Sequence, residues 1–210
     1  MARGRSPGYE DQREQILLHA AELFAQSGYS ATSMNEVAQA SGMSKPTIYH
    51  YFRDKYALLF EISHSHVSRL QDLVEQVRQQ DLEPRERLRR LILCFVHEYA
   101  SAKHAQRVLI EAVRFLQPED QQLVLDKERF VVQAFSETVV QLRPDMAQAG
   151  LAKALSMLLF GMMNWMFTWL RADGPLNHET MAPMVADLFM GGIEAVQTPS
   201  SEGQKKLAQH

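Results

Sequence analysis

The stretch SMNEVAQASGMSKPTIYHYFRDK, residues 33–55, predicts two short helices joined by a tight turn. Ser33 and Glu36 form an S-x-x-E capping box, in which each side chain satisfies a free amide at the start of the first helix. Gly42 ends that helix and supplies a turn residue that tolerates positive φ. The small Ala38, four residues earlier, lets the two helices approach closely. These features together predict a helix-turn-helix.

The second helix of the pair has one buried side and one exposed side. Ser44 caps it, and Pro46 falls in its first turn, where a missing N–H costs little. Ile48 and Phe52 are four residues apart and are therefore expected to pack inward together. The residues left to face outward are Lys45, Thr47, Tyr49 and His50, and Asp54 is expected to cap the next helix. Such a helix can read DNA in the major groove; the alternative is an ordinary helical hairpin with a polar surface.

Three segments carry a more specific resemblance: ILLHAAELFAQSGY (16–29), TSMNEVAQASGMSKPTIYHYF (32–52) and RDKYALL (53–59). Together they resemble the DNA-binding domain of the TetR family of bacterial regulators. The aromatic run 49–52 followed by Lys55 is more specific than a general helix-turn-helix pattern. The resemblance implies an all-α protein with an N-terminal three-helix helix-turn-helix domain and a C-terminal helical bundle for ligand binding and dimerisation. Many family members have glycine at the position of Pro46, and proline is a variant that also occurs in the family.

The composition is that of a globular protein. With 210 residues, 46% hydrophobic and 22% charged, the chain is long enough for one sizeable core or two small ones. The single cysteine, Cys94, lies in an apolar run, so we expect a small buried side chain and a reducing, cytoplasmic compartment. No apolar stretch follows Arg3 and Arg5, so a signal peptide is not expected. The apolar run 154–170 contains polar residues and is interpreted as a helix buried in protein, with no association with a membrane.

The charge of the chain does not by itself indicate a nucleic-acid partner, because the formal net charge is −3. Residues 1–55 hold six basic and six acidic residues, which gives that segment a net charge of zero. DNA binding is therefore predicted from the motif, and we expect only modest non-specific affinity, since that term grows with the number of phosphates neutralised.

Proline, glycine and apolar periodicity divide the rest of the chain into helices. The expected segments are helices at 10–27, from after Asp54 to about Gln80, and at 85–102, 105–116, 118–143, 145–172 and 179–196, with no strand and no repeat. We accordingly predict a flexible arm (1–9), a helix-turn-helix DNA-binding domain (10–55), a helical ligand-binding and dimerisation domain (56–197) and a disordered tail (198–210).

Side-chain chemistry and position in the motif assign roles at the DNA. Lys45 can reach guanine acceptors or a phosphate, while Pro46 and the Thr47 methyl group can meet a thymine methyl group. The predicted phosphate contacts are Ser33, Tyr49, Tyr51 and Lys55, with Lys55 aided by a helix N-terminus; His50 could take either role, and Ser44 completes the set.

A single recognition helix reads about one half-site, so two copies are needed roughly 34–36 Å apart. The resemblance implies a homodimer on a near-palindromic operator of double-stranded DNA. It also implies that the last two long helices form the dimer surface. In this chain they are the richly apolar segments 147–170 and 179–196, as expected of helices covered on more than one side.

The resemblance further implies that the C-terminal domain binds a small-molecule effector that releases DNA. The segment GMMNWMFTWLR, residues 161–171, resembles the subgroup that controls degradation of fatty acids, sterols or aromatic acids and responds to acyl-CoA thioesters. Such an effector needs an apolar slot and basic groups for its phosphates. The candidate ligand-binding residues are Phe95, Tyr99, Arg107, Arg114, Phe115, Met162, Asn164, Trp165 and Trp169, although core or dimer packing explains the apolar ones equally well. A second basic group, Arg85, Arg87, Arg89 and Arg90, is as well explained as a solvated face.

No enzyme chemistry, cofactor or metal site is expected. The His64-x-His66 pair diverges on a helix, and no carboxylate or cysteine completes a set at metal-ligand spacing. No nucleophile elbow or phosphate loop is present. The leading interpretation is a repressor that an acyl-CoA releases from DNA. The alternatives are an efflux regulator that senses a lipophilic drug, and a ligand-free architectural DNA-binding protein, which the neutral first domain disfavours.

Overall fold

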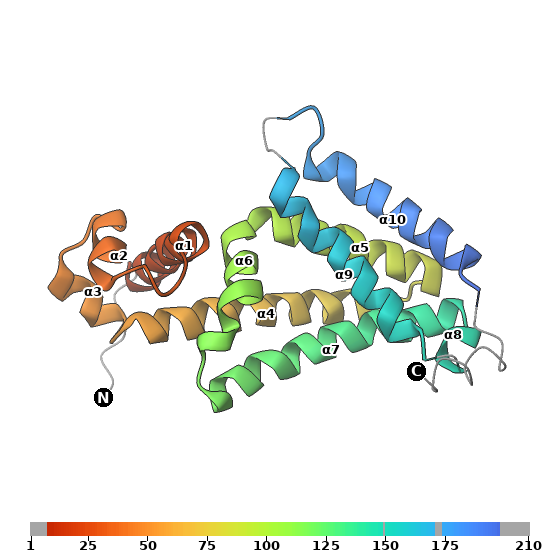
Figure 1. The fold of residues 1–210 in the computed structure, drawn as a ribbon, viewed down its shortest axis with the longest axis horizontal. Coiled ribbons are helices and arrows are strands. Elements are labelled where there is room, and N and C mark those ends of the chain that lie inside the picture. The colour runs from red at the N-terminus through yellow and green to blue at the C-terminus, as the bar shows by residue number, and fades with distance from the viewer. Residues whose placement is uncertain (1–7, 149, 171–173, 198–210) are drawn as a thin grey trace, which may run out of the picture. The chain divides into compact units, whose positions relative to one another are not determined.

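The computed structural model describes residues 8–148, 150–170 and 174–197, and every regular element among them is a helix (Figure 1). The predicted all-α fold is confirmed. Most of the predicted arm (1–9) and all of the predicted tail (198–210) lie outside the described residues. The described chain forms two compact units, which do not follow the order of the sequence: residues 8–69 with 102–127, and residues 70–101 with 128–197.

The first unit contains the predicted helix-turn-helix. It begins with α1 (Tyr9–Ser27), α2 (Met34–Ala40), α3 (Lys45–Tyr51) and the first part of α4 (Lys55–Arg78). Ile48 and Phe52, predicted to pack inward, are buried in its interior together with Ile16, Phe24 and Val37, and all five are at most 4% exposed. Each such side chain stabilises the fold by roughly 1.5–3 kcal/mol through the apolar surface removed from water.

The first unit is completed by α6 (Lys103–Ala112), the 3₁₀ turn η1 (Val113–Phe115) and the start of α7 (Pro118–Leu142). α6 packs against α1. The predicted helix 105–116 therefore begins two residues earlier, and its last turn tightens into a 3₁₀ turn before the chain becomes extended at Leu116. Helical structure resumes at Pro118, whose fixed φ suits the first position of a helix.

The second unit is a helical bundle with an aromatic centre. It consists of α5 (Pro84–Ser101), the rest of α4 and α7, α8 (Asp145–Gln148), α9 (Ala152–Trp169) and α10 (His178–Ala195). The rings of Phe95, Phe135 and Phe160 meet edge to face, with the centroids of Phe95 and Phe135 5.0 Å apart and those of Phe135 and Phe160 4.9 Å apart. α10 packs along α5 and also contacts α9.

The predicted single helix 145–172 is wrong, because the structure divides it into α8 and α9. Gly150 has φ of +67°, a left-handed conformation that ends the first segment. The N–H of Leu151 donates to the carbonyl oxygen of Met146 at 3.0 Å, which is the six-to-one bond of a glycine-terminated helix. The last helical residue of α9 is Trp169, and the predicted end at Ala172 lies outside the described residues.

Two polar contacts fix the ends of α10. The side chain of Asn177 accepts a hydrogen bond from the N–H of Thr180 at 2.9 Å and so caps the first turn. At the other end, Arg143 donates to the carbonyl oxygens of Ile193 (2.6 Å) and Val196 (3.0 Å) while it pairs with Asp145. A cation placed on the last carbonyls of a helix also complements the helix dipole.

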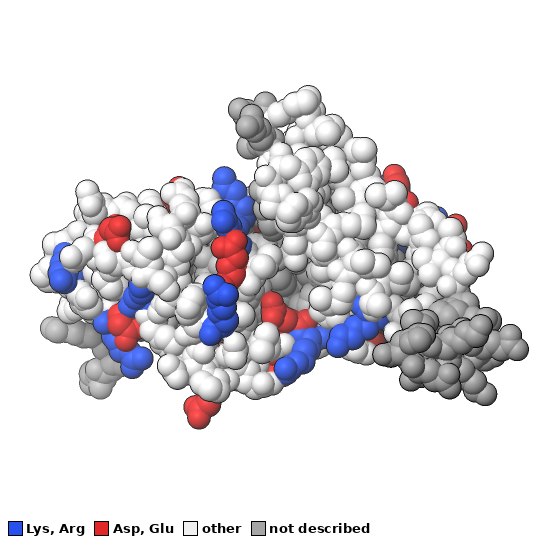
Figure 2. All heavy atoms as spheres, viewed as in Figure 1, with Lys and Arg blue, Asp and Glu red and all other residues white. Residues whose placement is uncertain are grey.

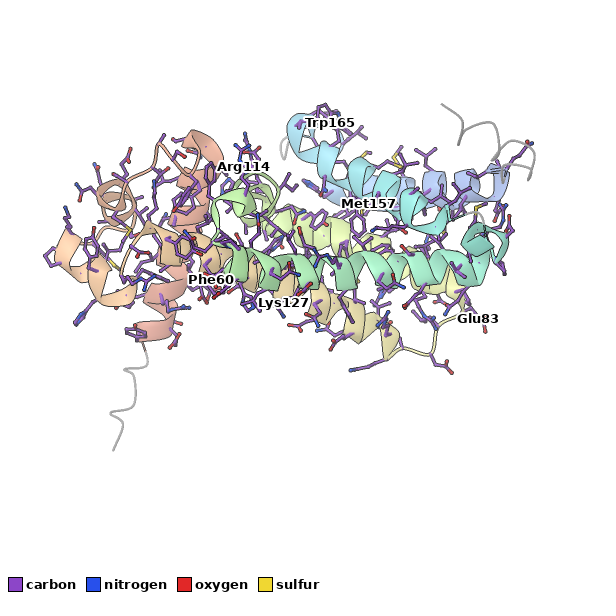
Figure 3. The ribbon with its side chains drawn as sticks, turned by 60° about the horizontal axis from the view of Figure 1, so that its bottom comes forward. Phe60, Glu83, Arg114, Lys127, Met157 and Trp165 are labelled. Carbon is purple, nitrogen blue, oxygen red and sulfur yellow. The ribbon has the colours of Figure 1, made fainter. Side chains whose placement is uncertain are left out.

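The apolar side chains of α10 lie on two faces, one buried and one exposed. Val185, Phe189 and Ile193 are buried, whereas Met184 and Leu188 are 51% and 68% exposed. α9 likewise exposes Met157, Leu158, Trp165 and Trp169; Figure 3 shows Met157 and Trp165 along this helix. Cys94, expected to be buried, is only partly so. None of the helices in the described ranges has the length and apolar character required to cross a membrane.

Candidate DNA-binding site

The predicted recognition helix α3 packs against the core through its inner side and is capped at its start. Ser44 Oγ accepts the N–H of Thr47 at 3.3 Å and lies 2.7 Å from Thr47 Oγ1. Ile48 is fully buried and Phe52 is 4% exposed, so the inner side of the helix is anchored in the core. Gly42 has φ of +65° in the turn before it, as predicted. The α2–turn–α3 geometry expected from the sequence is therefore present.

The outer face of α3 is exposed and available to a partner. Lys45, Pro46, Thr47, Tyr49 and His50 are all exposed. Among the described residues, no hydrogen bond or ion pair engages the side chains of Lys45, Tyr49 or His50. A helix with a fixed inner side and a polar outer side of this kind can donate to phosphates and base edges without breaking contacts of its own.

Ser33 forms the predicted capping box at the start of α2. Its hydroxyl donates to Glu36 Oε2 at 2.7 Å and accepts the N–H of Glu36 at 3.3 Å, and its own N–H donates to the same carboxylate at 2.7 Å. The hydrogen bonds from Ser33 lower the pKa of Glu36. The hydroxyl proton of Ser33 is therefore already used within the cap.

Tyr51 joins the end of α3 to α1. Its ring stacks on that of Tyr9 with centroids 4.7 Å apart, and its hydroxyl donates to Gln12 Oε1. Tyr51 is half-buried by these contacts. Tyr51, predicted to contact a phosphate, therefore also packs against α1 and orients α3.

Lys55 Nζ points into the turn between α1 and α2. It donates to the carbonyl oxygens of Tyr29 (2.7 Å), Ser30 (3.2 Å) and Thr32 (2.7 Å). It also lies 4.5 Å from the centre of the Tyr29 ring. An ammonium group has three hydrogens, so all of its donors are occupied in this arrangement.

The next residue, Tyr56, makes a contact that sequence reasoning did not find. Its hydroxyl donates to Asp120 Oδ2 at 2.6 Å and accepts the backbone N–H of Gln117 at 3.0 Å. Burial, followed by the hydrogen bond to Asp120, raises the pKa of Tyr56. The acidic first turn after Pro118 indicates a helix start, but no local signal pairs it with a tyrosine some sixty positions earlier.

The predicted effector residues do not gather in one place. Phe95 and Tyr99 lie in the core of the second unit, at 0% and 3% exposed, while Met162 and Asn164 are half-buried. Trp165 and Trp169 are exposed at 67% and 48%. Arg107, Arg114 and Phe115 belong to the first unit, where Arg107 pairs with Glu111 at 2.8 Å and the Arg114 guanidinium lies over the Phe115 ring.

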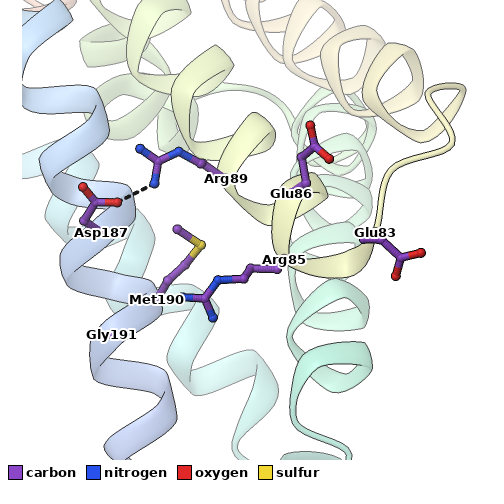
Figure 4. Close-up of a pocket in the computed structure, with 7 residues that line it drawn as sticks. All are labelled: Glu83, Arg85, Glu86, Arg89, Asp187, Met190 and Gly191. Carbon is purple, nitrogen blue, oxygen red and sulfur yellow. Dashed lines mark hydrogen bonds and ion pairs between the residues drawn. The ribbon is translucent and has the colours of Figure 1, made fainter.

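Neither of two surface hollows in the described part of the second unit is lined by a predicted effector residue. The first, of about 520 Å³, lies between α5 and α10, where Arg89 pairs with Asp187 (Figure 4). Arg85 pairs with Glu194, and Arg87 donates to the carbonyl oxygen of Leu82. Arg85 and Arg89 therefore link α5 to α10, and the Arg85 side chain remains 60% exposed, in keeping with the solvated face that the sequence allowed. The second hollow, of about 440 Å³, is lined by α7, α8 and α9.

Charge and metal-ligand chemistry add little to the site. On the face seen in Figure 2, basic and acidic groups are interspersed. His66, one half of the H-x-H pair, is buried with Nε2 2.6 Å from Gln106 Oε1. Within the described ranges, no group of three or more histidine, cysteine or acidic residues could hold a metal ion.

This fold and its exposed recognition helix define a helix-turn-helix DNA-binding regulator. Residues 16–62 match the bacterial regulatory proteins of the tetR family, and residues 81–193 match the tetracyclin repressor-like C-terminal domain. The chain therefore belongs to the TetR family, as its motifs predicted, and is a transcriptional regulator rather than an enzyme.

Three relatives illustrate the range of similarity. A TetR-family transcriptional regulator from Bordetella parapertussis 12822 has a crystal structure with a TM-score of 0.83 and 33% identity, covering 90% of this chain and 100% of that one. The transcriptional activator FasR of Mycolicibacterium smegmatis is 25% identical over 92% of this chain and 88% of its own length. The crystal structure of AibR in complex with isovaleryl coenzyme A and operator DNA has a TM-score of 0.67 and 25% identity, covering 90% of this chain and all of that one.

Proposed function

We propose that this regulator is a cytoplasmic repressor that binds a near-palindromic operator as a homodimer and is released by a small molecule. The observation that carries the proposal is the outer face of α3, on which Lys45, Tyr49 and His50 are exposed while Ile48 and Phe52 anchor the helix. Pro46 and Thr47 lie beside them and can meet thymine methyl groups. Ser33, Ser44, Tyr51 and Lys55 hold this helix and its neighbours in place.

The exposed apolar residues of the last two long helices support the homodimer. Met157, Leu158, Trp165 and Trp169 of α9 and Met184 and Leu188 of α10 are each 48–68% exposed. Large apolar side chains gathered on two helices commonly mark a protein–protein interface. Aromatic residues such as Trp165 are enriched at the centres of such interfaces. A second copy of this chain is the partner that these helices fit.

An acyl-CoA thioester is the effector that we propose. AibR, whose structure holds isovaleryl coenzyme A, shares 25% identity with this chain. The segment 161–171 adds the resemblance described above, and the aromatic centre around Phe95 supplies apolar side chains that could open to an acyl group. The second candidate effector is a lipophilic drug, which the same apolar centre would accept and which requires no phosphate-binding groups.

Measurements of operator binding test whether α3 is the helix that contacts DNA. Wild-type protein would be used to select a binding sequence from randomised DNA, and affinity would be measured for Lys45→Ala, Tyr49→Ala and the control Lys103→Ala on α6. We expect the two α3 variants to bind about tenfold or more weakly, because each removes a base or phosphate contact worth roughly 1–3 kcal/mol. Lys103→Ala should bind as wild type. Unchanged affinity in both α3 variants, with the fold intact, would exclude α3 as the reader.

A thermal-shift titration tests the effector. Isovaleryl-CoA, longer acyl-CoAs and arylacetyl-CoAs would be compared with the corresponding free acids. A ligand at 100 times its dissociation constant stabilises the fold by about 2.7 kcal/mol, which such a titration detects. A shift with a thioester and none with its acid supports the acyl-CoA proposal. If no thioester raises the melting temperature, the acyl-CoA proposal is wrong and the lipophilic drug becomes the proposed effector. Because FasR is named an activator, reporter transcription from the selected operator decides between repression and activation.

A further inference from the structure

The first turn of α7 is capped by a side chain from a distant part of the first unit. Gln117 is the residue before α7, and its carbonyl oxygen accepts the first helical hydrogen bond from Gln121 at 2.8 Å. In a capping box, the acidic residue three positions later would accept the N–H of this capping residue directly. Here the Tyr56 hydroxyl stands between the two groups: it accepts the N–H of Gln117 and donates to the carboxylate of Asp120.

Tyr56 is the second residue of α4, the helix that follows the recognition helix in the sequence. Phe52, the residue that ends α3, is buried, and Asp54 Oδ1 accepts the N–H of Ala57 at 2.8 Å to cap α4. Only three residues, Phe52, Arg53 and Asp54, connect α3 to α4. A displacement of the first turn of α4 is therefore transmitted directly to α3.

A second contact supports the same junction. The ring of Tyr29, near the start of the α1–α2 connection, has its centroid 5.3 Å from that of the Phe115 ring in η1. Tyr29 also meets Phe24 edge to face at 5.3 Å and lies beneath Lys55 Nζ. Two contacts therefore join the helix-turn-helix to the η1–α7 corner. The Tyr29–Phe115 ring contact does not depend strongly on direction, whereas the two hydrogen bonds of the Tyr56 hydroxyl do.

We propose that Tyr56 is a positioning residue that ties the recognition helix to α7 and so sets the spacing of the two recognition helices in the dimer. This inference rests on the proposed function. α7 runs from Pro118 in the first unit to Leu142 in the second, so both units share this helix. A shift of α7 is transmitted to α3 through the Tyr56 hydroxyl, because that group fixes the orientation of α4 against the first turn of α7.

The test compares Tyr56→Phe, which removes only the hydroxyl, with Tyr29→Phe as a matched control. The Tyr29 ring belongs to the same junction, but within the described chain its hydroxyl makes no hydrogen bond of the bridge. Affinity would be measured for the selected operator and for the same operator with one base pair inserted between its half-sites. Wild-type protein and Tyr29→Phe should discriminate strongly between the two. Tyr56→Phe should lose roughly tenfold of that discrimination, which is the loss expected for a hydrogen bond to a charged group.

Hydrogen–deuterium exchange of the DNA-free protein supplies a second readout. The amides of Gln117, which donates to the Tyr56 hydroxyl, and of Gln121, which donates to the carbonyl oxygen of Gln117, should exchange faster in Tyr56→Phe and remain as in wild type in Tyr29→Phe. Asp120→Asn, which keeps an acceptor but removes the charge, should give an intermediate result and replaces Tyr56→Phe if that variant does not fold. Unchanged half-site discrimination in Tyr56→Phe overturns the positioning role, even if the exchange rate rises. If wild-type protein selects no operator, the proposed function itself fails and this inference falls with it.

Discussion

The ammonium group of Lys55 lies 2.7 Å from the carbonyl oxygen of Thr32, the residue directly before the Ser33 cap of α2. Lys55 also donates to the carbonyl oxygens of Tyr29 and Ser30. The first residue of α4 therefore holds the turn from which α2 begins. A group whose three hydrogens satisfy three backbone carbonyls contributes to the shape of the reader, whereas the motif alone suggested a contact to phosphate.

Replacing Lys55 by Met separates these two roles. We expect the free energy of unfolding to fall by about 1–3 kcal/mol, because three carbonyl groups lose a charged donor. The slope of log affinity against log salt concentration should not change. Lys45→Met is the matched control: loss of a phosphate contact there would reduce the slope by about 0.9 per site. A reduced slope for Lys55→Met, with unaltered stability, would restore Lys55 as a phosphate ligand.

The two serines that flank α2 are expected to differ in their contribution to stability. Ser33→Ala removes the capping side chain and should lower the free energy of unfolding by about 1 kcal/mol. Ser41→Ala should be neutral or slightly stabilising, because its buried hydroxyl finds no hydrogen-bond partner in the described structure. Urea unfolding of both variants measures the difference. If Ser33→Ala and Ser41→Ala lower the free energy of unfolding equally, the capping box does not stabilise the protein more than a hydroxyl without a partner does.

His66 predicts a loss of stability in mild acid. Burial lowers the pKa of His66 from 6.5 to about 4. Arg69 Nη2 lies 3.4 Å from Nδ1 and can only donate, so Nε2 carries the proton that the ring donates to Gln106. Between pH 6.5 and 4 the unfolded chain binds a proton that the native state does not. The contribution of His66 is therefore complete above pH 6.5 and is lost as the pH falls towards 4, by about 3 kcal/mol in total.

The measurement is urea unfolding at pH 7 and pH 4 for wild type, His66→Gln and the control His97→Gln. His97 is exposed on α5. The decrease in unfolding free energy between the two pH values should be smaller in His66→Gln than in wild type, while His97→Gln should follow wild type. The same decrease in all three proteins would mean that other groups account for the acid sensitivity.

Leu188 tests the proposed dimer surface. It is 68% exposed on α10, and Leu188→Asp would place a charge in the proposed interface. We expect the dimer to weaken by about 30-fold or more, since a central interface residue contributes at least about 2 kcal/mol. Light scattering over a range of concentrations measures the change. Leu18→Asp is the control, because Leu18 is 55% exposed on α1 of the first unit. A dimer unaffected by Leu188→Asp would require another interface.

The sequence by itself determined the helix-turn-helix and the face that α3 presents. The Ser33–Glu36 box, the turn at Gly42 and the burial of Ile48 and Phe52 follow from preferences that act within about four residues. Such local preferences do not depend on the rest of the fold, so the sequence alone was enough to recognise them. The break at Gly150 was local too, but the apolar run around it obscured the signal.

Only the tertiary structure decided what Lys55, Tyr56 and the two faces of α10 do. The partners of Lys55 are 23–26 positions away and those of Tyr56 are 61–64 positions away, so no periodicity indicates them. Val185 and Leu188 are both apolar, yet one is buried and the other is 68% exposed, because packing against α5 covers only one side of the helix. A pattern shows that a side chain can be buried, whereas burial itself depends on which neighbour arrives to cover it.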